Sequence, residues 1–120
     1  DMREPIQFAL TFPLRMNLSN RKLDFASLRS LTFEAPDLAR FPAWALSYEA
    51  LQGGGNLACV MNAANEVAVA AFLKGRIRFY DIPEVISKCM ASVTHIAKPS
   101  FEDIYNTNDE AVRLAESMIW

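Results

Sequence analysis

Apolar residues recur at helical spacing along most of the chain, and the longest such pattern runs from Asn56 to Gly75. Steps of three and four residues place eight apolar side chains on one face of an α-helix. These are Leu57, Val60, Met61, Ala64, Val67, Ala68, Ala71 and Phe72. Asn56 is a favourable N-cap residue, and Gly75 is favourable just beyond the last turn. The pattern therefore predicts a central helix against which the other elements pack.

A second stripe predicts a helix over about residues 41–51, with Pro42 in its first turn, where the missing N–H costs nothing. The apolar residues of this stripe are Phe41, Trp44, Ala45, Tyr48 and Leu51. Gly53, Gly54 and Gly55 follow, and we expect them to end the helix in a flexible hinge. Phosphate-binding loops also contain several glycines, but the preceding strand and the following Lys-Ser/Thr that they need are missing here.

Two more helices are predicted toward the C-terminus. Asp81 and Glu84 fit a capping box, in which each side chain satisfies a backbone N–H, and the helix they begin runs to about Val93. Ser100 can cap a single turn. A second capping-box pattern over residues 107–110 then begins the last helix.

The first 35 residues follow a different pattern. Residues 1–13 predict a short helix that is apolar on two faces, and a helix of that length is not stable alone in water. Turn-forming residues predict a linker over residues 17–35, in which Asp24 caps a one-turn helix ending at Leu28. The predicted fold class is therefore all-α, a small helical bundle preceded by an extended linker and a detached N-terminal helix.

Composition narrows the class of protein. A chain of 120 residues with 52% hydrophobic residues is typical of one small globular domain, and a net charge of −2 gives no reason to expect nucleic acid. No apolar run approaches the roughly 18 to 20 residues that span a bilayer, and no signal peptide opens the chain. Cys59 and Cys89 lie in apolar stripes and are interpreted as buried thiols in a reducing compartment, the cytoplasm, with a disulfide or a reactive thiol as the alternative.

Candidate chemistry is sparse. The acidic pairs at residues 102–103 and 109–110 both begin predicted helices, where negative charge favours the helix dipole. His95 has no neighbour in sequence that suggests a metal site or a catalytic triad. Lys74, Arg76 and Arg78 form the densest basic group, which indicates a solvated helix end, with an anion site as the alternative. The residues alone therefore predict no catalytic, cofactor-binding or metal-binding side chain.

One polar row interrupts the central helix. Asn62, Asn65 and Glu66 are spaced so that they share one side of it. The structural interpretation is a polar clamp, in which two amides and a carboxylate satisfy backbone groups of an irregular segment packed against the helix. The functional interpretation is a substrate-binding or acid–base cluster on a rigid helix. On the residues alone we favour the clamp, which makes the chain a supporting or interaction domain.

Three stretches resemble one enzyme family. They are DMREPIQFALTFPLR at residues 1–15, LTFEAPDLARFPAWALSYEAL at residues 31–51 and NAANEVAVAAFL at residues 62–73. In order and separation they are similar to the C-terminal third of 1-deoxy-D-xylulose 5-phosphate reductoisomerases. That family rearranges and reduces 1-deoxy-D-xylulose 5-phosphate to 2-C-methyl-D-erythritol 4-phosphate in the non-mevalonate route to isoprenoids, using NADPH and Mg or Mn.

The resemblance implies a domain division and a location for the site residues. Residues 1–16 would be the last helix of the parent's catalytic domain, residues 17–35 the linker and residues 36–120 the C-terminal helical domain. Met2 matches a family position at the apolar edge of the substrate pocket. The family's residues for NADPH, metal and phosphate all lie upstream, so the chain alone is expected to be inactive and to partner the remainder of the enzyme.

Two further expectations concern partners. The chain starts at Asp1, inside an apparently structured segment, which suggests a piece of something longer. Its first helix, at residues 1–13, should then expose apolar faces and could pair with a second copy. The alternative is a free-standing helical interaction module that uses Phe8, Phe12 and Trp44 to bind a partner, and such a module should bury those faces.

Overall fold

The structure, a computed structural model, describes residues 2–19 and 23–119. Six helices and no strand occur in that part of the chain, which confirms the predicted all-α class. The contacts divide the chain into two compact units, Asp1–Glu34 and Ala35–Trp120, and each is described by itself. No helix among the described residues combines the length and the apolar character needed to cross a membrane.

The first unit contains α1 (Arg3–Thr11) and the one-turn α2 (Phe25–Leu28). No residue of α1 is buried, although its aromatic rings are ordered locally: Phe8 and Phe12 meet edge to face at 5.5 Å. The guanidinium of Arg15 lies over the Phe8 ring, 4.3 Å from its centroid. Asp24 caps α2 as predicted, because its carboxylate accepts a hydrogen bond from the Ala26 N–H.

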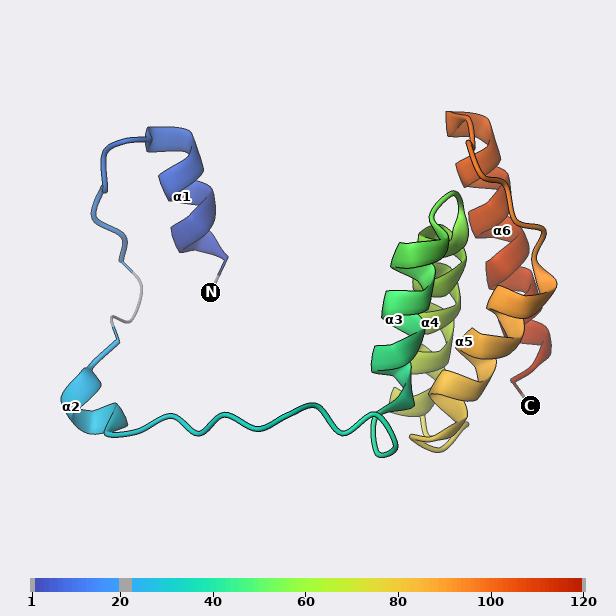
Figure 1. The fold of residues 1–120 in the computed structure, drawn as a ribbon, viewed down its shortest axis with the longest axis horizontal. Coiled ribbons are helices and arrows are strands. Elements are labelled where there is room, and N and C mark those ends of the chain that lie inside the picture. Colours follow the sequence, from blue (N-terminus) through green and yellow to red (C-terminus); the bar gives the residue numbers. More distant parts are fainter. Residues whose placement is uncertain (1, 20–22, 120) are drawn as a thin grey trace. The chain divides into compact units, whose positions relative to one another are not determined.

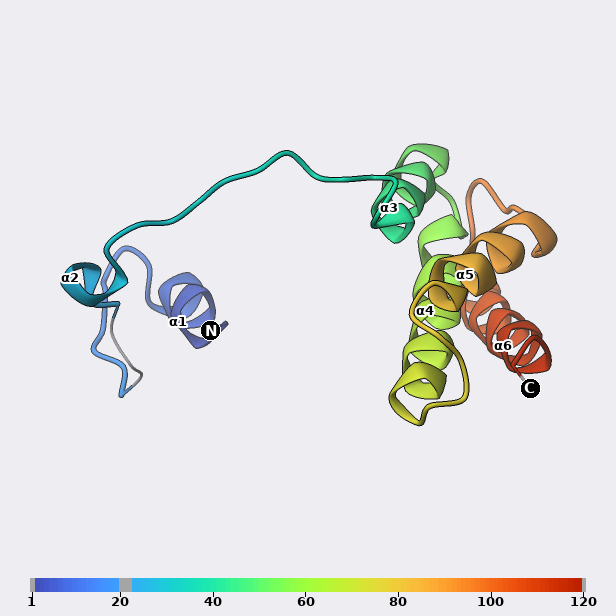
Figure 2. The ribbon, with the colours of Figure 1, turned by 90° about the horizontal axis from the view of Figure 1, so that it is seen from below.

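The second unit is a bundle of four helices: α3 (Pro42–Gly53), α4 (Leu57–Leu73), α5 (Asp81–Ser92) and α6 (Phe101–Ser117). The central helix predicted from Asn56 to Gly75 is α4, and it packs against each of the other three (Figures 1 and 2). Small residues such as Ala64 and Ala68 are fully buried on it, which lets the neighbouring backbones approach closely. Ile86 and Cys89 of α5 and Ala111 and Ala115 of α6 complete the centre of this core.

The last helix differs from its prediction. The single turn at Ser100 and the helix expected from residue 107 are one continuous helix, α6. Its capping box is formed by Ser100 and Asp103, and Thr107 lies inside the helix with only 3% of its surface exposed. Thr107 shares a buried face with Ala111 and Ala115, so the turn-like residues around it are overridden by packing.

The start of α5 also differs. Asp81 and Glu84 form no capping box. The Asp81 carboxylate instead accepts hydrogen bonds from the Arg78 backbone N–H, at 2.7 Å, and from the Arg78 guanidinium. Glu84 pairs with Lys88 one turn later, at 2.7 Å. The helix therefore begins on an exposed Arg–Asp pair rather than on a reciprocal cap.

Candidate functional site

The predicted polar row lies on the surface of α4. Asn62 and Glu66 are exposed, and the Asn62 amide donates to the Glu66 carboxylate at 3.3 Å. Asn65 is half-buried. Among the described residues, this hydrogen bond joins two side chains of the row to each other. It does not pair with a backbone N–H or C=O group of another segment. The irregular segment that this clamp was predicted to hold, residues 17–34, belongs to the other unit, so the clamp at Asn62, Asn65 and Glu66 stays a prediction.

The buried polar clamp of the bundle is built on Asn56 instead. This side chain is completely buried, and its Oδ1 accepts the Ile96 N–H at 2.9 Å. Its Nδ2 donates to the Thr94 carbonyl at 3.0 Å and to the Thr107 hydroxyl at 3.1 Å. Asn56 was predicted as the N-cap of α4. It occupies that position, but its side chain makes no cap hydrogen bond and ties the loop before α6 to α4.

The glycines before Asn56 make this arrangement possible. Gly55 has φ +59°, and a Cβ there would collide with the Ile96 carbonyl oxygen. The same carbonyl accepts the Asn56 backbone N–H at 3.1 Å. Gly55 therefore approaches the loop before α6 closely, whereas Gly54 has open space around it, and the flexible hinge over residues 53–55 stays a prediction. A glycine run followed directly by Asn is the signal from which the close approach could have been inferred.

The apolar stripe predicted on α3 faces outward. Phe41, Trp44, Tyr48 and Leu51 are 47%, 48%, 53% and 74% exposed, and Ala50, on another side of the helix, is the one buried residue of α3. α3 packs against α4 and α5 only, among the described helices. We call these four outward residues the α3 outer face. The periodicity identified them correctly as one group, but the described bundle buries none of them, and the Arg40 guanidinium lies 5.5 Å from the centroid of the Phe41 ring.

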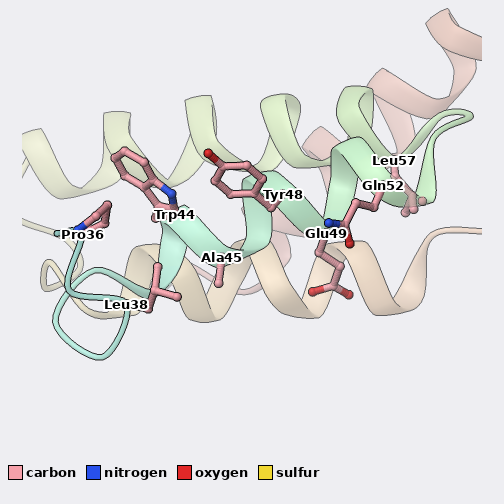
Figure 3. A pocket seen from close by; sticks show the side chains of 9 residues that line it. Pro36, Leu38, Trp44, Ala45, Tyr48, Glu49, Gln52 and Leu57 are labelled. Carbon is pink, nitrogen blue, oxygen red and sulfur yellow. The ribbon is translucent and has the colours of Figure 1, made fainter.

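Two shallow grooves run beside this face. The first is lined by Pro36, Leu38, Trp44, Ala45, Tyr48, Glu49, Gln52, Gly53 and Leu57. Figure 3 shows the rings of Trp44 and Tyr48 side by side along α3, with the Glu49 carboxylate pointing away from them. These rings are stacked, with centroids 6.3 Å apart. The second groove is lined by Ala43, Trp44, Ser47, Tyr48, Leu51, Met61, Asn65 and Ile86, so Asn65 joins an otherwise largely apolar surface.

Arg76 and Arg78 of the basic group have hydrogen-bond partners, and both thiols are at least partly buried. The Arg76 guanidinium donates to the Ile119 carbonyl at 3.4 Å, and Arg78 pairs with Asp81. Neither cysteine is in a disulfide. Cys89 is completely buried and Cys59 half-buried, and burial raises the pKa of both thiols, which disfavours the reactive thiolate.

The remaining candidates stand apart from any cluster. Met2, predicted at the edge of a substrate pocket, precedes α1 in the first unit and is 70% exposed. Among residues 2–19 and 23–119, no group of three or more His, Cys, Asp or Glu side chains is placed to hold a metal ion. The α3 outer face with its two grooves is the surface feature to which the predicted stripe and Asn65 both belong.

Comparisons with known proteins agree on one relationship. A family model described as the DXP reductoisomerase C-terminal domain matches residues 1–114. The chain is 49% identical over 119 residues to the 1-deoxy-D-xylulose 5-phosphate reductoisomerase of Phocaeicola vulgatus, covering 99% of this chain and 31% of that relative. It is 48% identical over 119 residues to the enzyme of the same name from Acetivibrio thermocellus, again covering 99% of this chain and 31% of the relative.

Solved structures show the same likeness. The reductoisomerase from Zymomonas mobilis in complex with NADPH superposes with a TM-score of 0.85 at 45% identity, covering 98% of this chain and 31% of that one. A DOX-P reductoisomerase in complex with magnesium superposes with a TM-score of 0.83 at 33% identity, covering 98% of this chain and 32% of the other. The chain thus spans about a third of the length of the proteins it matches.

Proposed function

The chain belongs to the 1-deoxy-D-xylulose 5-phosphate reductoisomerase family, whose C-terminal domain it matches over residues 1–114, and from this premise we propose that it is the supporting helical domain of such an enzyme. The parent enzyme would rearrange and reduce 1-deoxy-D-xylulose 5-phosphate for isoprenoid synthesis. The observation that carries this proposal is the identity of 49% sustained over 119 residues.

The chemistry itself is assigned to the parent and not to this chain. The two solved relatives are complexes with NADPH and with magnesium. The described residues offer neither group a matching site, because they contain no strand for a dinucleotide-binding turn and no cluster of metal-binding side chains. We therefore derive no catalytic step through this chain, and we propose that it is inactive alone.

The domain division follows from the same premise. We propose that residues 1–16 end the parent's catalytic domain, that residues 17–35 link it to the helical domain, and that Met2 lines the substrate pocket. The exposure of α1 supports this assignment: Ile6, Leu10 and Phe12 are 53%, 82% and 72% exposed. Within the first unit by itself, α1 therefore has no apolar cover.

Location and self-association remain narrower proposals. Two thiols, neither in a disulfide, support a reducing, cytoplasmic compartment. We also propose that the isolated chain self-associates through residues 1–13, because their apolar side chains lack the parent's cover. Analytical ultracentrifugation tests this, and a monomer at all concentrations would contradict it. The expected self-association should be weakened by Leu10→Lys.

A chimeric enzyme tests the supporting role. The upstream two thirds of the Phocaeicola vulgatus relative would be joined to this chain in place of its own C-terminal third. NADPH oxidation would be followed with the phosphosugar and Mg²⁺. We expect turnover by the chimera, none by this chain alone, and little by the upstream segment alone. The relative's unmodified enzyme is the positive control. An upstream segment as active and as stable as the chimera would refute a supporting role.

A further inference from the structure

We draw no further inference here: the strongest candidate, the exposed aromatic cluster of Phe72, Phe79 and Tyr80 where α4 ends and α5 begins, carries nothing because it is an unpartnered apolar face and nothing among the described residues shows what covers it.

Discussion

Asn56→Ala should be among the most damaging single changes in the helical domain. The substitution removes three side-chain hydrogen bonds, to Ile96, Thr94 and Thr107, from a residue that is completely buried. It also leaves a small cavity at the start of α4. Buried groups that lose their partners cost about 1–3 kcal/mol each, and the cavity adds to this.

The magnitude follows from how exposed the three partners are. Thr107 is buried, but its hydroxyl can rotate toward another acceptor. The hydrogen bonds to Thr94 and Ile96 are only partly buried, so water can reach those two backbone groups. We therefore expect a loss of about 3–5 kcal/mol, near the sum of three modest penalties and the cavity. That is a large share of the roughly 5–15 kcal/mol by which small domains are stable.

Urea unfolding followed by helical circular dichroism measures the effect. With an m-value of about 1.5 kcal/mol/M, the midpoint should fall by about 2–3 M. Asn62→Ala is the matched control, because it removes the same amide from an exposed site on the same helix and should cost under about 0.5 kcal/mol. Thr107→Val removes one partner only, and its effect should not add to that of Asn56→Ala. Equal stabilities for the Asn56 and Asn62 variants would refute the buried clamp.

Two further variants probe neighbouring features. Gly55→Ala should cost about 3 kcal/mol of stability, because the new Cβ would displace the Ile96 carbonyl. Gly54→Ala has open space around it and should cost about 1–2 kcal/mol, because Gly54 has a positive φ. Thermal melts compare the two variants, and equal losses of stability would contradict the close approach at Gly55. Hydrogen bonds from Ser100 lower the pKa of Asp103 in the folded state. The ionised Asp103 carboxylate therefore stabilises the fold fully above its unfolded pKa of about 3.9, and this stabilisation is lost as pH falls through its lower pKa in the folded state. Asp103→Asn should therefore melt below the parent at neutral pH, with the gap closing as pH falls below the unfolded pKa of about 3.9. A gap independent of pH would count against the capping carboxylate.

Much of the fold follows from local patterns. The extent of α4 was predicted within two residues at either end, because its apolar spacing and terminal residues point to the same bounds. The position of Pro42 at the start of α3 was predicted for the same reason. The break expected before residue 107 was wrong because Thr107, a poor helix former, is recruited to the buried face that Ala111 and Ala115 define. Their spacing of four residues was the signal available in the sequence.

The candidate site was harder to predict, because its features depend on distant partners. Asn56 pairs with groups 38 to 51 residues away, and the glycine run before it signals a close backbone approach without identifying those partners. The residues of the α3 stripe were predicted correctly, but the sequence did not show that the stripe faces outward from the bundle. Periodicity shows which side chains share a face, and only the packed structure shows whether that face is covered. The same applies to Asn65, whose place in a groove emerges from the neighbouring helix.

The limited packing of α3 against the bundle has a consequence for local unfolding of the domain. Because α3 buries one residue and lacks contact with α6 among the described helices, it should separate from the bundle more readily than α4, α5 or α6. A released α3 would present its backbone to proteases while the other three helices still held their core. A cell could therefore recognise and remove domains that had failed to assemble, because the same helix that needs a partner is the first to become cleavable without one.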